Sequence, residues 1–545
     1  MHFSQHDIQQ ISKEYIYRQN FERVAALLEM ALADLTVCHD RLNQNPSNSS
    51  KPPSSRPPWD RSSSGKSNTD NKNEPDAQHE DDATTGIDQE RDNDNKAVQD
   101  ENKEGKNGEN LSSASSSSSN NDKEKKRKPG KQKGAKGYGR TQKLVVTKEI
   151  IHRPDCCKGC GVKFDETTPY TRIGGHYTID IQHAEQGSIG LQGTNIKHVY
   201  TLARCSCGHM TTTGPYCAYS EPGWHVELGE WRLIGPRLLS LIVFLKMRTH
   251  MTVAKTREFF ATWLGLSLSD GCINTAFREA GRAAAYLEPE IIEAVKAAEE
   301  ICIDETSWNE HKITRWLWAA VANDAVYYTV GSRSTETAQK ILNGFNGTIM
   351  ADGYGAYRHF EQRVRCWAHL ERKAKALQES WDTSAAAFGA YAVETFKVLR
   401  EQVYRMREKQ KNERGKEESF CYAKKIEFLM QCVRYKDAVH DKTREFAREI
   451  YNDNPAIFRV LMNPELPLTN NKAERALRCW VILRNMCYGS KTEEGSKAIA
   501  ILASVADTLR MRSQNVWEFL SLLIKQRRSG QPPPRLPSLA ISITS

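Results

Sequence analysis

The feature that most constrains the fold is a series of strand-length apolar runs in the middle of the chain, two of which end in an aspartate. The run "EICIDETSW" predicts a strand that ends at Asp304, and "GTIMADGYGAY" predicts a buried strand that ends at Asp352. Between them, two strands meet at an Asn323–Asp324 turn, and a helix follows with Ser334 or Thr335 as its N-cap. After Asp352, "RVRCWAHLERKAKAL" predicts a short strand that enters a helix.

A third acid, Glu474, lies in the helix-forming segment "NNKAERALRCWVILRN", 122 positions after Asp352. The intervening residues are largely helix-forming, so we interpret 376–465 as a helical insertion. The order β-β-β-α-β-α then predicts a multidomain α/β protein with a ribonuclease-H-like mixed sheet core over residues 296–375 and 466–525. In that fold the first strand lies beside the fourth, which would make Asp304 a neighbour of Asp352.

Three carboxylates brought together in this way are a donor set for two divalent cations, Mg²⁺ or Mn²⁺. Hard cations take oxygen ligands, and two of them about 3.5–4 Å apart can stabilise the attacking and leaving oxygens of a phosphodiester. We therefore predict that Asp304, Asp352 and Glu474 are metal ligands and catalytic residues. Arg475 and Arg478 follow Glu474 on the same helix and are candidate phosphate-binding cations.

Each acid also has an ordinary structural explanation. An aspartate after a strand is often a turn former, and a glutamate followed by arginine on a helix is often a surface ion pair. Their joint occurrence, in this order and on these elements, favours metal binding. The sequence leaves open whether Glu305 contributes beside Asp304.

Six of the fourteen cysteines fall within a segment of turns and short predicted strands, 144–217. Thiolates from two knuckles can complete a tetrahedral Zn²⁺ site. The candidate ligands come from "CCKGCG" and "CSCGH": Cys157, Cys160, Cys205 and Cys207. The second knuckle has one residue between its cysteines where two are usual, so His209 is an alternative fourth ligand. A structural or vestigial knuckle pair without metal is the other interpretation.

Residues 1–45 predict a helix whose apolar residues recur alternately four and three positions apart. The members of this seam are Tyr17, Phe21, Val24, Leu28, Ala31, Leu35, Cys38 and Leu42. The pattern is typical of a leucine-zipper-like coiled coil that joins copies of a chain. An amphipathic helix packed on its own protein is the alternative.

Residues 46–143 predict a disordered linker, because Ser, Asn, Pro, Asp and Lys dominate and no apolar periodicity is present. The linker is acidic first and basic later: from Lys123 to Arg140 it holds nine Lys or Arg against one Glu. Such a stretch suits a nucleic-acid backbone, whereas a merely solvated charge run is the alternative. The net charge of the whole chain, +9, is compatible with nucleic-acid binding without requiring it.

Residues 218–295 are helix-forming and outline a helix-turn-helix, with a short turn after Gly265. We expect Arg278 and Arg282 on the second helix to face DNA, although a purely structural helical hairpin has the same outline. Residues 526–545 predict a flexible C-terminal tail. The N-terminus has no secretory h-region, and the longest strongly apolar stretch, 238–245, is far shorter than a membrane span. A cytoplasmic, nucleoid-associated protein is expected.

Four stretches of the chain resemble the transposases of the bacterial insertion-sequence-sixty-six family. They are "NSSKPPSSRPP", "RKPGKQKGAKG" with the following CxxCG knuckle, "DGYGAYRHF…CWAHLERK", and "NNKAERALRCWVILRN…GSKTEEGSKAIAILASVADT". The resemblance runs from residue 48 to about residue 522. It implies a DDE transposase whose acidic triad corresponds to Asp304, Asp352 and Glu474.

The resemblance also implies partners. They are double-stranded DNA, as transposon ends and target, a second copy of the chain, and accessory proteins encoded by the same element. Many DDE enzymes have Lys or Arg seven residues after the glutamate, where this chain has Val481. Arg478, Arg484 or Lys491 would then make that DNA contact. The "CWAH" stretch, Cys366 to His369, is a family signature to which the sequence assigns no chemistry.

The sequence thus predicts a DNA transposase that cleaves DNA and transfers strands with the help of two metal ions. A catalytically inactive or domesticated DNA-binding protein derived from a transposase is the main alternative. A ribonuclease-H-like nuclease without strand transfer is a third interpretation, which differs only in its products.

Overall fold

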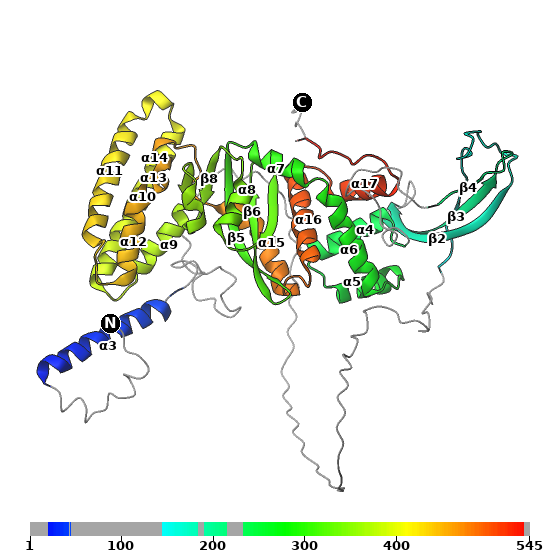
Figure 1. The fold of residues 1–545 in the computed structure, drawn as a ribbon. Helices are drawn as coiled ribbons and strands as arrows, with labels where there is room; N and C mark the ends of the chain where they lie inside the picture. The colour runs from blue at the N-terminus through cyan, green and yellow to red at the C-terminus, as the bar shows by residue number, and fades with distance from the viewer. Residues whose placement is uncertain (1–19, 43, 45–143, 184–189, 215–232, 539–545) are drawn as a thin grey trace, which may run out of the picture. The chain divides into compact units, whose positions relative to one another are not determined.

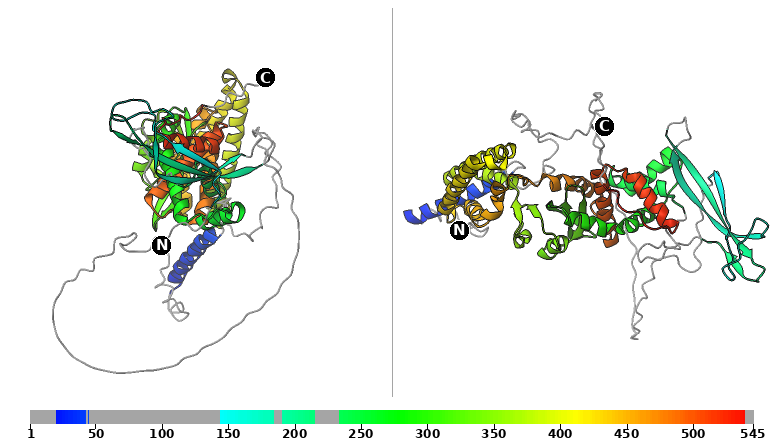
Figure 2. Two further views of the ribbon diagram at one scale, coloured as in Figure 1. Left: turned by 90° about the vertical axis from the view of Figure 1, so that its right-hand side faces the viewer. Right: turned by 90° about the horizontal axis from the view of Figure 1, so that it is seen from above.

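The computed structural model describes residues 20–42, 44, 144–183, 190–214 and 233–538. The predicted disordered linker, the basic stretch within it and the first part of the seam helix lie outside these residues. The described chain is of the mixed α/β class, with two separate sheets and many helices (Figures 1 and 2). No helix in these ranges is long and apolar enough to cross a membrane.

The larger sheet has five strands in the order β7-β6-β5-β8-β9 (Figure 1). β5, β6 and β7 are antiparallel neighbours, whereas β8 runs parallel to β5 and β9 runs parallel to β8. The bounds are β5 Glu300–Glu310, β6 Ile313–Val321, β7 Val326–Gly331, β8 Thr348–Ala351 and β9 Arg363–Arg365. The predicted neighbouring of the first and fourth strands is therefore present.

The predicted end of the first strand was wrong. β5 does not stop at Asp304 but continues to Glu310, paired with β6 as far as Glu310 opposite Ile313. The extension is stabilised by Trp308, which is buried and donates its indole N–H to Ser490 Oγ at 3.0 Å. Asp304 therefore lies inside a long strand. The sequence pattern suggested a strand end at this position because polar residues follow Asp304.

The other local predictions around the sheet are confirmed. Asp352 directly follows β8, and the β6–β7 connection contains the Asn323–Asp324 turn. α8 (Thr335–Leu342) has Ser334 as its N-cap, with the side chain accepting from the Thr337 N–H. β9 leads into α9 (Trp367–Gln378).

Two late helices cover the sheet. α15 (Asn471–Cys487) packs on β5 and β6, and α16 (Glu493–Met511) packs on β7. β7 is an edge strand, and α16 covers its free backbone groups: Tyr328 N–H donates to Ser504 Oγ at 2.9 Å, and Val326 N–H donates to Thr508 Oγ1 at 3.0 Å. Side chains of α16 thereby complete hydrogen bonds that a further strand would otherwise make.

The segment between α9 and α15 is helical, as predicted. Its bounds are α10 Thr383–Glu408, α11 Gly415–Tyr435, α12 Asp441–Asn452, α13 Asn454–Ile457 and α14 Arg459–Met462. α10 packs on α9 and α11, and its buried Phe396 meets Phe428 of α11 edge to face with ring centroids 5.6 Å apart. These helices therefore share one apolar core.

The smaller sheet is the predicted β-rich segment. β1 (Lys148–His152), β3 (Leu191–Arg204) and β2 (Tyr170–His183) lie side by side, and β4 (Met210–Thr212) pairs with β3. β2 also joins the helical region, because Leu238 N–H of α4 (Pro236–Met247) donates to Asp180 at 2.7 Å.

The predicted helix-turn-helix outline is present as α5 (Val253–Leu264) and α6 (Asp270–Ala285). α6 is largely a core helix, since Ile273, Phe277 and several small residues on it are buried. It packs on α16 so closely that a Cβ at Gly281 would come 2.5 Å from the Cβ of Ala498. This burial favours the structural interpretation of the hairpin.

Two terminal segments complete the described chain. α17 (Val516–Arg528) extends into the predicted flexible tail, and Leu536 beyond it is buried with its N–H donating to Glu290 at 3.2 Å. The prediction of a flexible tail from residue 526 was therefore wrong as far as residue 538. α3 (Phe21–Leu42) keeps seam residues such as Leu28 and Leu35 exposed.

Candidate active site and cysteine cluster

The pairing of β5 with β8 brings Asp304 and Asp352 to the same level of the sheet. Cys302 lies opposite Met350 in this parallel pair, and each aspartate comes two residues later in its strand direction. Because side chains two residues apart share one face of a strand, both carboxylates leave their strands toward the same side. The register thus makes neighbours of two acids 48 residues apart in sequence.

The pKa of the Asp304 carboxyl is shifted by burial and by other acidic groups. Burial raises the pKa of this carboxyl well above its usual range, and the negative charges of Glu305, Asp352 and Glu474 raise it further. Its Oδ1 accepts the N–H of Glu305 at 2.9 Å, which opposes the rise only in part. Buried like charges are unfavourable unless a cation or a proton compensates them.

Glu474 is held near Asp304 by a buried asparagine. Asn470 precedes α15, donates its side-chain amide to the carbonyl of Ile303 at 2.9 Å, and donates its backbone N–H to Cys366 Sγ at 3.3 Å. One residue thus joins three segments, namely β5, the entry to α9 and the start of α15. Glu474 follows in the first turn of α15.

Within the described residues, the three carboxylates are neighbours but do not form the tightest group. The compact groups of metal-ligand side chains, with ligand atoms all within 4.8 Å of one another, are the four cysteines and the set Cys366, His369 and Glu474. His369 Nδ1 lies 3.8 Å from Glu474 Oε1, and an Arg372 guanidinium nitrogen lies 3.7 Å from the same oxygen. The "CWAH" motif therefore lies beside the third acid, which the sequence pattern did not indicate.

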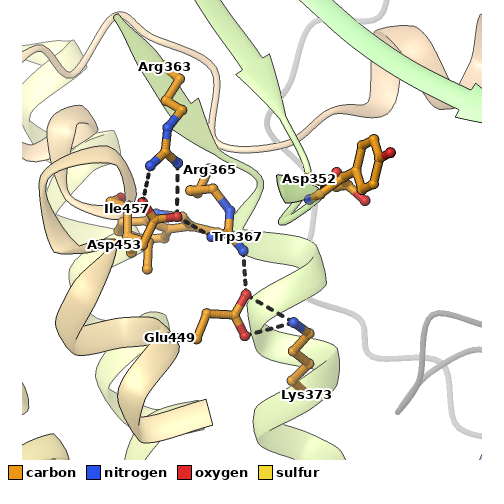
Figure 3. Close-up of polar contacts among 9 residues, drawn as sticks. Asp352, Arg363, Arg365, Trp367, Lys373, Glu449, Asp453 and Ile457 are labelled. Atoms are coloured by element: carbon orange, nitrogen blue, oxygen red, sulfur yellow. Dashed lines mark hydrogen bonds and ion pairs between the residues drawn. The ribbon is translucent and has the colours of Figure 1, made fainter. Parts of the chain in front are cut away.

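Asp352 lies beside an ion-pair network that joins β9 to the helical segment (Figure 3). Arg365 of β9 contacts both Asp453 and Glu449, Arg363 contacts Asp453, and Glu449 also binds Lys373 at 2.7 Å. The indole N–H of Trp367 donates to the Ile457 carbonyl at 2.8 Å in the same region. The Arg365 side chain is only 4% exposed, so this network is largely shielded from water.

Glu305, which the sequence left open, is used in a different way. Its buried carboxylate accepts from Arg333 Nε at 3.0 Å and from the Tyr357 hydroxyl at 2.7 Å. Arg333 in turn lies over the rings of Trp316 and Tyr354, with 4.4 and 4.3 Å to the ring centroids. The Tyr354 N–H donates to Asp352 at 2.8 Å, so this cluster supports the loop that bears Asp352.

The six predicted DNA-contacting cations fall into two groups. Arg475, Arg478 and Lys491 are exposed. The other three have intramolecular partners: Arg278 and Arg282 both pair with Glu494 of α16, and Arg484 donates to Thr306 and Ser307 of β5. DNA binding by any of the six stays a prediction.

The four predicted zinc-ligand cysteines come together. Cys157 Sγ lies 3.7 Å from Cys207 Sγ, and Cys160 Sγ lies 3.5 Å from Cys205 Sγ. A tetrahedral zinc ion with Zn–S bonds of about 2.3 Å separates its sulfurs by about 3.8 Å. The four thiols thus fit one ion, and in the described residues Cys207 rather than His209 completes the group.

Residues 232–498 match the family described as Transposase IS66 family. These residues form an IS66 transposase family domain. The matched segment contains all three acids and begins after the four-cysteine cluster. The family expected from the sequence motifs is thereby confirmed for this segment.

Similar proteins of Sinorhizobium fredii are themselves uncharacterized. The chain is 26% identical to y4qI over 277 residues, which cover 46% of this chain and 51% of that protein. It is 20% identical to y4jD over 437 residues, covering 74% and 80%, and 25% identical to y4hP over 320 residues, covering 51% and 56%. The chain thus spans about half the length of two of these relatives, and they add no activity of their own.

Proposed function

We propose that this protein binds the ends of its insertion sequence and catalyses metal-dependent DNA strand cleavage and strand transfer. The observation that carries the proposal is the convergence of Asp304, Asp352 and Glu474 within the family-matched segment. The sheet order β7-β6-β5-β8-β9, with three antiparallel strands followed by two parallel ones, supports a ribonuclease-H-like core.

Asp304, Asp352 and Glu474 would hold two Mg²⁺ or Mn²⁺ ions. When bound, such ions activate the attacking oxygen and neutralise charge on the scissile phosphate. The fit rests on Asp304: its burial among like charges makes the ionised carboxylate unfavourable until a cation arrives. Oxygen donors alone also suit these hard cations.

The surrounding residues would orient the DNA and the acids. Arg475 and Arg478 are exposed one and four positions after Glu474, where they can bind phosphates next to the reacting bond. Asn470 and the Arg365 network would fix the carboxylates, so that little reorganisation is needed when DNA and metal bind. Binding through such cations weakens as salt rises.

We further propose that the four cysteines hold a structural Zn²⁺ ion and that the protein acts as a dimer or larger assembly. Two transposon ends require two active sites, which supports at least two copies. The exposed seam residues of α3 are one surface available for that contact. Accessory proteins from the same element remain part of the proposal on family grounds alone.

The test is a Mg²⁺-dependent cleavage and joining assay on DNA ends taken from the sequence flanking the gene. Asp352→Asn should abolish both products and keep DNA binding. Asp437→Asn, which changes an exposed acid of the helical segment, should keep both. Binding without cleavage in the unaltered protein, with Mg²⁺ and Mn²⁺ both tried, would favour the inactive DNA-binding alternative.

A further inference from the structure

A second compact set of metal-ligand side chains lies where two helices begin. Cys366 is the N-cap of α9 and His369 is in its first turn, so their spacing of three puts them on one side of the helix. Glu474 enters from the first turn of α15. Two hydrogen bonds connect the starts of the two helices. The Asn470 N–H donates to Cys366 Sγ, and the Trp367 N–H donates to the Leu468 carbonyl.

Two buried atoms in this set face each other without a hydrogen bond. His369 Nδ1 and Glu474 Oε1 are buried and have no hydrogen-bond partner among the described residues. The 3.8 Å between them is too long for a hydrogen bond, whose upper limit is about 3.2 Å. Leaving two such buried groups unsatisfied is destabilising.

The same separation suits two ligands of one ion. Bonds of about 2.0–2.2 Å to nitrogen and oxygen put tetrahedral ligands about 3.4 Å apart, so a shift of a few tenths of an ångström would close the site. The Cys366 thiol, fully buried, lies within 4.8 Å of a ring nitrogen of His369 and a carboxylate oxygen of Glu474. An ion there would give both unpaired atoms a partner.

The donor set also selects the ion. One sulfur, one imidazole nitrogen and one carboxylate oxygen are ligands for Zn²⁺-type transition metals, whereas Mg²⁺ prefers oxygen alone. We propose that Cys366, His369 and Oε1 of Glu474 bind one transition-metal ion of the Zn²⁺ class at a site separate from the four-cysteine cluster, which leaves Oε2 of Glu474 for the ions held with Asp304 and Asp352. With three protein ligands the fourth position stays open, unlike the complete cysteine cluster.

The neighbouring Arg372 opposes this ion. Its guanidinium lies 3.7 Å from Glu474 Oε1 and competes for the same oxygen. The site should therefore bind more weakly than the cysteine cluster, and Arg372→Gln should strengthen binding. Lys373, the next cation along α9, is engaged with Glu449 at 2.7 Å and does not compete.

Metal binding tests the proposal without any use of strand cleavage. The full chain, loaded with zinc, is titrated with Co²⁺, and the thiolate-to-cobalt absorption is recorded beside the zinc content per chain. Cys366→Ser and His369→Asn should each lose one metal equivalent, and Arg372→Gln should shift the titration to lower Co²⁺. Exchange at the four-cysteine cluster is common to all variants and cancels in the comparison.

Cys302→Ser is the matched control, because Cys302 is an equally buried thiol outside the compact set. It should keep the full metal content. Equal metal content and absorption in Cys366→Ser, His369→Asn and the unaltered chain would overturn the proposal. Circular dichroism melting identifies a variant that has lost metal by unfolding, and His369→Asn, at the more exposed position, decides the case if Cys366→Ser does not fold.

Discussion

The side-chain amide of Asn470 donates to the carbonyl of Ile303, the residue immediately before Asp304. This one contact joins the helix that bears Glu474 to the strand that bears Asp304, across 167 positions of sequence. Asn470 is fully buried, so water cannot replace the bond. The relative position of two of the three acids therefore depends on an uncharged residue.

Asn470→Ala should destabilise the protein by about 1–3 kcal/mol, because the Ile303 carbonyl then stays buried without its donor. Strand cleavage should fall further than stability does, since the Glu474 helix loses its link to β5. Urea unfolding and cleavage rates at saturating Mg²⁺ measure the two effects. Asn471→Ala, at the exposed next position, is the control, and equal behaviour of the two variants would remove Asn470 from the positioning role.

Gly353→Ala should displace Asp352. A Cβ at Gly353 would lie 2.5 Å from an Arg365 guanidinium nitrogen and 3.0 Å from Glu449 Oε1, both within the network of Figure 3. Because this network is buried and paired, the loop has to move, and a shift of about 1 Å can lower a rate by about 100-fold. Cleavage assays should show that loss with DNA binding retained. Gly355→Ala, where a Cβ meets nothing within 4 Å, should have near-normal activity.

Glu449→Gln should destabilise the protein. It should also make the stability of the protein depend less on pH in the acid range. Burial works to raise the pKa of Glu449, but Lys373 and Arg365 outweigh burial and lower it. A lowered folded-state pKa gives stability that is present above the unfolded value, about 4.3, and is lost as pH falls toward the folded value. Removing one partner of a buried pair costs about 3 kcal/mol at neutral pH.

Melting temperatures between pH 3 and pH 7 check this prediction. The difference between Glu449→Gln and the unaltered protein should shrink as the pH falls. Glu394→Gln changes an exposed acid paired with Lys397 and should leave the curve unchanged. A difference that stays constant with pH would mean that the ionised form of Glu449 contributes nothing.

Sequence reasoning succeeded where the signal is local. Ser334 as a cap, the Asn323–Asp324 turn and Asp352 after an apolar run each depend on residues within a few positions. It failed for β5, because the partner strand rather than the polar residue after Ile303 decides where that strand stops. It also could not foresee that Arg278 and Arg282 meet Glu494, more than 200 positions away. Asn470 and Arg365 carried no signal either, since their partners are brought to them only by the completed fold.

Cys157→Ser should release zinc and unfold the small sheet locally, because the four thiols join the β1–β2 connection to the β3–β4 connection. Structural zinc contributes directly to folding, so loss of one ligand outweighs the small change in side-chain volume. Cys156→Ser is a close control, since Cys156 is adjacent, exposed and outside the compact group. Metal analysis and limited proteolysis of residues 144–214 should separate the two variants. Equal zinc content in both would argue against the four-cysteine site.

Asp304→Asn should stabilise the protein and abolish strand cleavage. The folded-state pKa of Asp304 is raised, first by burial and then by Glu305, Asp352 and Glu474. A raised pKa means that the group favours the fold below its unfolded pKa, about 3.9, and that this advantage is lost as pH rises through the folded value. At neutral pH folding must therefore either bury the charge of this acid or bind a proton to it, and Asn removes that cost.

Thermal melting at pH 7 in buffer without added Mg²⁺ or Mn²⁺ should give a higher Tm for Asp304→Asn than for the unaltered chain. Adding Mn²⁺ should raise the Tm of the unaltered chain more than that of the variant, because bound cations stabilise only the folded state that holds them. A lower Tm for the variant without metal would show that Asp304 serves the fold rather than the reaction. A higher Tm together with lost cleavage is the pattern of a residue kept for catalysis at the expense of stability.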